Sequence, residues 1–188
     1  MLINFSDTLT SVNLARWRKL KRTIERLALL GAYERANVWM SLGLAQRLRV
    51  RALIEAFKEG GKVLDVGCGP APYTSIIEAM QPDFYVCLDP SVAVLKTLNV
   101  GPLMERVAGM VEWLPFRNSS FDSSVAMFSL RDFLDKAAGI AEMARVSSAI
   151  VFLDLFRPNG FVALVLGLFY LAAVAPLLAF LSTGVRRG

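Results

Sequence analysis

A glycine-rich turn between a predicted strand and a predicted helix constrains the fold of this chain more than any other feature. The segment VLDVGCGPAPYT runs from Val63 to Thr74. Glycines in such a turn let the backbone approach a ligand closely. The G-x-G-x-x-G fingerprint of dinucleotide folds is incomplete, because Gly67 and Gly69 are followed by Pro72 where the third glycine is expected. The turn is either a ligand loop of another kind or a tight turn that needs glycine for its geometry alone.

Two acids accompany this turn. Asp65 lies two residues before Gly67 at the end of the first predicted strand, and Asp89 closes the next one. An acid at the tip of the second strand is the position that accepts hydrogen bonds from ribose hydroxyl groups. The spacing therefore favours a nucleoside-containing ligand.

The hydrophobic pattern alternates between strands and helices across the middle of the chain. Strands are predicted at 62–66, 84–88, 106–110, 124–128 and 149–155, and helices at 71–80, 91–98 and 136–145. Alternation of this kind predicts an α/β fold, with a Rossmann-like parallel sheet of about five strands and helices on both faces. We expect three regions: a basic N-terminal helical extension at 1–60, an α/β core at 61–157 and an apolar tail at 158–188.

The N-terminal region is basic. Residues 1–62 contain 12 Lys and Arg against 5 Asp and Glu, whereas residues 63–188 contain 9 against 11. Residues 12–30 have the periodicity of a basic amphipathic helix, and a second helix is predicted over 33–58 with a break around 41–43. A basic face fits an anionic partner such as a membrane surface, or is simply solvated.

The tail is almost entirely apolar. No charged residue lies between Pro158 and Val185, and about 20 apolar helical residues span a bilayer core. Pro176 would kink or split such a helix. The tail is therefore predicted as an apolar helix or helical hairpin that anchors the chain in a membrane, lies at its surface or covers the core.

The rest of the composition excludes several chemistries. There is no histidine, so a Ser-His-Asp triad, a Cys-His pair and a histidine metal site are excluded, and we predict no metal. Cys68 and Cys87 are too few for a disulfide scaffold and are expected to be packing residues in a reducing compartment.

The loop and the second-strand acid together resemble class I S-adenosylmethionine-dependent methyltransferases. More narrowly, the chain resembles the ubiquinone/menaquinone C-methyltransferase (UbiE-like) family between about residues 33 and 184. The segments that carry this likeness are Tyr33…Asn37…Met40-Ser41-Leu42-Gly43, LDVGCG, CLDPS, Leu114-Pro115-Phe116, Ser120-Phe121-Asp122, Leu130-Arg131-Asp132 and VAPLLAFLSTG at 174–184.

The resemblance implies S-adenosylmethionine as cofactor. It assigns cofactor contacts to Asp65, Gly67, Cys68, Gly69, Asp89, Pro90, Met110 and Val111. Arg131 and Asp132 lie where the family places its catalytic pair at the substrate ring; Arg131 would stabilise a phenolate, and Asp132 would act as base or hold Arg131. Tyr33 would close over cofactor or substrate.

The chain departs from the family pattern at several positions. Ala71 replaces the third loop glycine, Met110 replaces an acid beside the adenine, and Asp132 replaces an asparagine. No segment for two further strands is found, so we expect an exposed sheet edge that needs a cover such as a second copy of the chain.

We expect a methyltransferase acting on a lipophilic small molecule, with C-methylation of a quinone precursor as the narrowest prediction. It would be cytoplasmic and associated with a membrane through the C-terminal segment. Methylation of nitrogen or oxygen in another small molecule is one alternative, and methylation of nucleic acid is disfavoured. A further alternative is a non-catalytic cofactor-binding or membrane-associated interaction protein with a degenerate methyltransferase fold.

Overall fold

The computed structural model describes residues 22–23, 25–26, 32–154 and 160–178. The predicted helix at 12–30 therefore lies mostly outside the described residues. The second predicted helix is confirmed as two helices, α2 (Ala32–Ser41) and α3 (Leu44–Phe57). Leu42 and Gly43 separate them with φ of 50° and 78°, a left-handed conformation that stops a right-handed helix.

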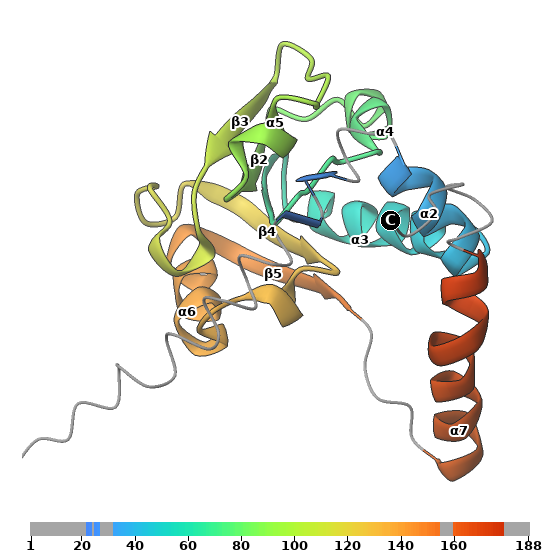
Figure 1. Ribbon diagram of the computed structural model, residues 1–188. Helices are drawn as coiled ribbons and strands as arrows, with labels where there is room; N and C mark the ends of the chain where they lie inside the picture. Colours follow the sequence, from blue (N-terminus) through green and yellow to red (C-terminus); the bar gives the residue numbers. More distant parts are fainter. Residues whose placement is uncertain (1–21, 24, 27–31, 155–159, 179–188) are drawn as a thin grey trace, which may run out of the picture.

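The core of the described structure is a five-stranded sheet whose registered pairs are all parallel (Figure 1). The sheet has the order β3-β2-β1-β4-β5. The strands are β1 (Lys62–Val66), β2 (Phe84–Asp89), β3 (Met104–Ala108), β4 (Phe121–Met127) and β5 (Ser147–Leu153). The order reverses between β1 and β4, and ligands of such sheets bind outside the carboxyl ends of the strands at this point.

Helices cover both faces of the sheet because β1 is apolar on both sides. Val63 joins a buried cluster with Leu53 of α3 and Ile77 of α4 (Thr74–Ala79). Leu64 points the other way and joins Met143 of α6 (Lys136–Val146). The predicted α/β architecture is confirmed.

The element boundaries differ from the prediction at several places. The helix predicted from residue 71 begins at Thr74, because Ala71 has φ of 33° and cannot start a helix. The third and fourth strands begin earlier, at Met104 and Phe121. The helix predicted at 91–98 is shorter, α5 (Val92–Leu95), and Ser91 caps it, since its hydroxyl accepts a hydrogen bond from the Val94 N–H at 3.2 Å.

The described part of the apolar tail contains α7 (Phe161–Phe169) and a π-helical stretch η3 (Tyr170–Val174). Figure 1 shows α7 projecting away from the sheet, and the Tyr170 hydroxyl donates a hydrogen bond to the Met40 carbonyl of α2. None of the described helices is both long and apolar enough to cross a bilayer. The choice between one helix and a hairpin stays a prediction, because residues 179–188 lie outside the described part.

Candidate active site

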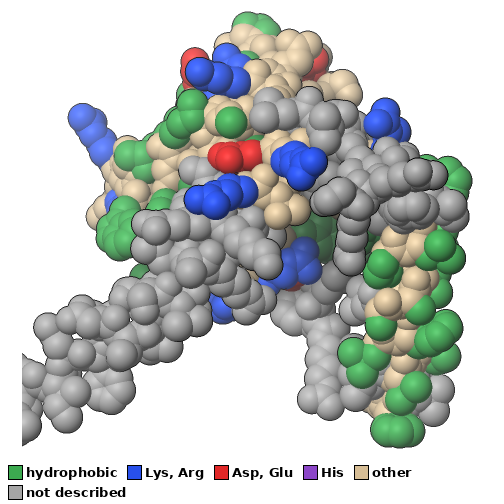
Figure 2. All heavy atoms as spheres, viewed as in Figure 1, with side chains coloured by type: hydrophobic (Ala, Val, Ile, Leu, Met, Phe, Trp, Pro, Cys, Tyr) green, Lys and Arg blue, Asp and Glu red, His purple; other side chains and the backbone are tan. Residues whose placement is uncertain are grey.

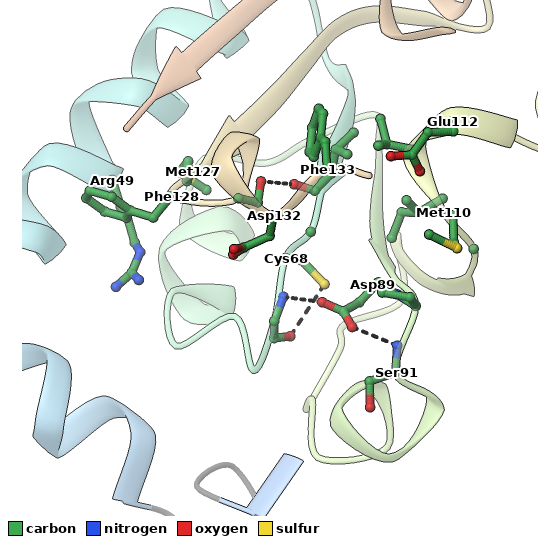
Figure 3. Close-up of a pocket in the computed structure, with 18 of the residues that line it drawn as sticks. Arg49, Cys68, Asp89, Ser91, Met110, Glu112, Met127, Phe128, Asp132 and Phe133 are labelled. Atoms are coloured by element: carbon green, nitrogen blue, oxygen red, sulfur yellow. Dashed lines mark hydrogen bonds between the residues drawn. The ribbon is translucent and has the colours of Figure 1, made fainter. Parts of the chain in front are cut away.

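A pocket lies at the carboxyl ends of β1, β2 and β4 (Figure 3). Its empty space is about 950 Å³, a volume that includes the part open to solvent. The two short turns η1 (Val111–Trp113) and η2 (Leu130–Asp132) contribute to its walls. Of the residues predicted from sequence, it is lined by Gly67, Cys68, Gly69, Asp89, Pro90, Met110, Val111 and Asp132.

The glycine loop depends on left-handed backbone at two positions. Gly67 has φ of 69° and Gly69 has φ of 59°. The N–H groups of Gly67 and Cys68 both donate to the Leu88 carbonyl of β2, at 2.8 and 3.1 Å. These bonds hold the loop after β1 against the end of β2. A Cβ on Gly67 would lie 2.6 Å from the Cβ of Ser129, whereas one on Gly69 would meet no described atom within 4 Å. The loop is therefore closely packed on one side and open on the other.

Asp89 joins the loop to the second strand. One carboxylate oxygen accepts a hydrogen bond from the Gly69 N–H at 3.0 Å, and the other accepts from the Ser91 N–H at 2.8 Å (Figure 3). The carboxylate is thus held in one orientation at the pocket wall.

The structure places Asp65 beneath the pocket rather than in its wall. Its side chain is fully buried, and one oxygen accepts hydrogen bonds from the hydroxyls of Tyr73 at 2.6 Å and Tyr85 at 3.0 Å. Burial raises the pKa of Asp65 to about 6, although the hydroxyls and the nearby Arg49 oppose the rise. Asp65 therefore supports the loop from below and does not line the pocket.

Cys68 lines the pocket but is not an activated nucleophile. Its thiol is buried, and burial raises its pKa well above the usual value. A thiol that stays protonated is a poor nucleophile, which agrees with the predicted packing role.

Arg49 is a pocket residue that sequence reasoning missed. It comes from α3, is only 6% exposed, and its guanidinium lies 5.2 Å from the ring centroid of Phe128 and 5.8 Å from that of Tyr73. Its Nη1 is buried and has no hydrogen-bond partner among the described residues. The sequence signal was faint, since Arg49 is one of three arginines at alternate positions in one helix.

Glu112 was missed as well. It lies in η1, is 6% exposed, and its Oε1 accepts hydrogen bonds from the N–H groups of Leu134 at 2.7 Å and Asp135 at 3.2 Å. Its Oε2 is buried without a hydrogen-bond partner in the described part of the chain. The family resemblance predicts cofactor contacts at the neighbouring Met110 and Val111 and not at this acid.

The structure separates the predicted catalytic pair. Asp132 lines the pocket, but Arg131 does not. The Arg131 side chain is about half exposed, donates to the Phe128 carbonyl at 3.2 Å and lies 3.7 Å from a carboxylate oxygen of Asp154. The backbone of Tyr33 belongs to α2, and the position of its side chain lies outside the described structure.

Comparison with known proteins agrees with this geometry. A family model described as a methyltransferase domain matches residues 64–149. A demethylmenaquinone methyltransferase of Roseiflexus sp. (strain RS-1) is 30% identical over 169 residues, which is 85% of this chain and 70% of that protein. The ubiquinone/menaquinone biosynthesis C-methyltransferase UbiE of Geotalea uraniireducens is 30% identical over 78% of this chain and 68% of its own.

A solved structure supports the fold. An S-adenosylmethionine-dependent methyltransferase of Mesorhizobium loti matches with a TM-score of 0.50 at 20% identity, over 57% of this chain and 52% of that one. At 20% sequence identity, this structural similarity supports the fold and not a shared activity.

Fold, glycine loop and second-strand acid define an S-adenosylmethionine-dependent methyltransferase of class I, and the matched domain and relatives agree. This favours the enzymatic prediction over the non-catalytic alternative. Two of these relatives are 30% identical to this chain, and the match covers more than two thirds of the length of each. The chain therefore belongs to the ubiquinone/menaquinone biosynthesis C-methyltransferase (UbiE-like) family.

The pocket fits the cofactor of this class. S-adenosylmethionine carries a carboxylate, a ribose diol and an adenine with a donating amino group. The pocket is lined by Arg49, whose buried Nη1 has no hydrogen-bond partner among the described residues, by the fixed carboxylate of Asp89, and by Glu112, whose buried Oε2 likewise has none in that part of the chain. Buried polar groups without partners are unfavourable, so a ligand that completes them is bound with a corresponding gain.

Proposed function

We propose that this enzyme methylates a ring carbon of a lipophilic quinol precursor. The observation that carries the proposal is Asp132, a carboxylate in the wall of the cofactor pocket beside the apolar side chains of Met127, Phe128 and Phe133. A proton acceptor set among apolar walls suits a hydroxylated aromatic ring. The names of the relatives, demethylmenaquinone and ubiquinone/menaquinone methyltransferases, point to the same substrate class.

The cofactor would be held along the pocket by this chain's own groups. The guanidinium of Arg49 would bind the carboxylate of the amino-acid end, and the open side of the loop at Gly69 would let the backbone come close. Asp89 would accept hydrogen bonds from the ribose, with Pro90 packing beside it. Met110 and Val111 would line the adenine. Asp65 would act by holding the loop, through Tyr73 and Tyr85.

When bound, S-adenosylmethionine supplies an electrophilic methyl group on a sulfonium. The Asp132 carboxylate would take a proton either from a ring hydroxyl, so that the ring carbon can form the new bond, or from the methylated carbon after that bond has formed, so that the ring becomes aromatic again. The pocket walls would orient the ring and exclude water. Arg131 stays outside this proposal as a contact residue, because its side chain is directed to Asp154.

The proposal also includes a membrane surface as the place where the substrate is met. Exposed apolar side chains on α2 and α7 support it, namely Trp39 (51% exposed), Phe161 (80%), Leu166 (63%) and Phe169 (63%). Figure 2 shows hydrophobic side chains along the projecting helix. Exposed Arg35 and Arg47 lie on the neighbouring α2 and α3 and would favour anionic lipid.

The test is methyl transfer from radiolabelled S-adenosylmethionine to demethylmenaquinol in detergent micelles, with product analysis by mass spectrometry. We expect a carbon-methylated product, and an Asp132→Ala variant with kcat lower by about a hundredfold or more. Glu105→Ala is the matched control, since Glu105 is an exposed acid on β3 that does not line the pocket. Methylation on oxygen, or full activity in Asp132→Ala, would contradict the proposal.

The cofactor orientation has its own test. Arg49→Met should weaken binding of S-adenosylhomocysteine by about tenfold or more, the worth of a charged hydrogen bond. Binding of 5′-methylthioadenosine, which lacks the carboxylate, should be unchanged. Equal losses for both ligands in titration calorimetry would mean that Arg49 supports the fold instead.

A further inference from the structure

The N-terminal segment reaches the rim of the pocket through a hydrogen bond. The Ser91 hydroxyl donates to Oε1 of Glu25 at 2.5 Å, although the two residues are 66 positions apart in the chain. Residues 22–23 and 25–26 are helical, with Arg22 and Arg26 exposed and Glu25 half-buried. Within this basic stretch the acid therefore contacts the α/β core, while its two cations are exposed.

Ser91 connects this contact to the pocket. It is one of the residues that line the pocket, and it is only 2% exposed. Its hydroxyl oxygen accepts a hydrogen bond from the Val94 N–H at 3.2 Å, so that the hydroxyl proton is donated to Glu25. A short O–H bond to a carboxylate belongs to the stronger class of protein hydrogen bonds. The position of Ser91 is thus set from two sides, by α5 and by the N-terminal segment.

The backbone of Ser91 in turn holds Asp89. The Ser91 N–H donates to one carboxylate oxygen of Asp89 at 2.8 Å, and the Gly69 N–H donates to the other at 3.0 Å. Figure 3 shows the Ser91 N–H bonded to Asp89 and the Ser91 hydroxyl directed away from it. Two hydrogen bonds therefore connect Glu25, through Ser91, to the carboxylate that receives the ribose in the proposed function.

We propose that Glu25 is a positioning residue for the cofactor. Glu25 is not among the described residues that line the pocket, so it acts through Ser91, by holding the turn that orients the Asp89 carboxylate. A group that is already oriented binds its ligand without the cost of ordering it. The inference rests on the proposed contact between Asp89 and the ribose, and it gives the N-terminal segment a part in cofactor binding.

The expected effect is specific to the ribose hydroxyl groups. Glu25→Ala removes the carboxylate that accepts from Ser91 and should weaken binding of S-adenosylhomocysteine by about tenfold. The 2′,3′-dideoxy analogue of this ligand lacks the hydroxyl groups that Asp89 would bind, so its affinity should fall by less than about twofold. A role of Glu25 in general stability would lower both affinities alike.

The experiment is titration calorimetry with both ligands on the wild-type chain and on variants of Glu25 and Ser91. Glu25→Gln keeps a side-chain oxygen for the Ser91 hydroxyl and should stay within about threefold of the wild type. Ser91→Ala should lose at least as much affinity for S-adenosylhomocysteine as Glu25→Ala. Adding Glu25→Ala to Ser91→Ala should cause no further loss, because both changes break the same bond.

Glu55→Ala is the matched control. Glu55 is an exposed acid of α3 that pairs with Lys58 and is not among the described lining residues. This variant should bind both ligands as the wild type does.

Three results would overturn the inference. They are wild-type affinity of Glu25→Ala for S-adenosylhomocysteine, an equal loss for both ligands in that variant, and additive losses in the double variant. Equal affinity of the wild-type chain for the two ligands would refute the proposed contact between Asp89 and the ribose, and this inference with it. No methyl acceptor takes part, so these outcomes are separate from failure of the proposed substrate class.

Discussion

At the scale of single residues, Asp65 links the cofactor loop to the pH dependence of stability. Its carboxyl is fully buried, and burial raises its pKa from 3.8 to about 6. The folded chain therefore holds the proton more tightly than the unfolded chain does. The contribution of Asp65 to stability is present in full below the unfolded pKa and is lost as the pH rises through about 6.

This predicts a measurable difference between the wild-type chain and Asp65→Asn, whose amide does not titrate. From about pH 4 to pH 7, the free energy of unfolding of the wild type should fall by about 2 kcal/mol relative to the variant. Urea denaturation at a series of pH values measures it. Tyr73→Phe should move the midpoint to higher pH, since the Tyr73 hydroxyl lowers the pKa of Asp65. A pH-independent difference would refute the role assigned to burial.

At the scale of elements, the loop after β1 and the turn after β4 must approach each other closely. Gly67 allows this approach, because a Cβ there would lie 2.6 Å from the Cβ of Ser129. The Ser129 hydroxyl in turn donates to the Val66 carbonyl at 2.7 Å, which joins the ends of the two strands. The pocket therefore lies at the carboxyl ends of the two neighbouring strands β1 and β4, where their loops pack together.

Two glycine variants separate backbone strain from packing at this junction. Gly69→Ala should cost about 1 kcal/mol of stability, the usual penalty for left-handed backbone at alanine, since its Cβ meets open space. Gly67→Ala carries the same strain and also displaces Ser129, so we expect a loss of about 2–4 kcal/mol. Denaturant unfolding of both variants is the measurement, and losses of equal size would contradict the packing argument.

At the scale of the whole molecule, α7 is set apart from the α/β core. Its described side chains are apolar and largely exposed, and Trp39 of α2 and Leu42 just after α2 are exposed as well. An exposed apolar surface of this kind indicates an interaction site. The proposed membrane surface fits it because exposed cations lie on the adjoining α2 and α3.

Vesicle co-sedimentation tests this surface directly. The chain should bind vesicles containing phosphatidylglycerol more tightly than vesicles of phosphatidylcholine alone. Replacing Leu166 and Phe169 together with aspartate should weaken binding by more than about tenfold, since two buried apolar side chains contribute about 3 kcal/mol or more. Leu103→Asp, at an exposed apolar position before β3, is the control. Unchanged vesicle binding in the double variant would exclude α7 as the contact.

The sequence by itself determined the order of strands and helices, the glycine loop and the second-strand acid. These features are local, since they depend on periodicity of two or 3.6 residues and on glycine at fixed positions. The sequence also indicated the family, because the family's short motifs can be recognised without knowing which residues are in contact in the fold. The break between α2 and α3 at Leu42–Gly43 could be predicted for the same reason.

Only the tertiary structure decided which side chains share the pocket. Arg49 lies on a helix before β1 and Glu112 on a turn after β3, and neither position has a local pattern that separates it from an ordinary surface charge. The same holds for Arg131, whose side chain lies beside Asp154, and for Asp65, whose side chain lies beneath the loop. Burial and hydrogen-bond partners arise from elements distant in the chain, and the chemistry of this site depends on them.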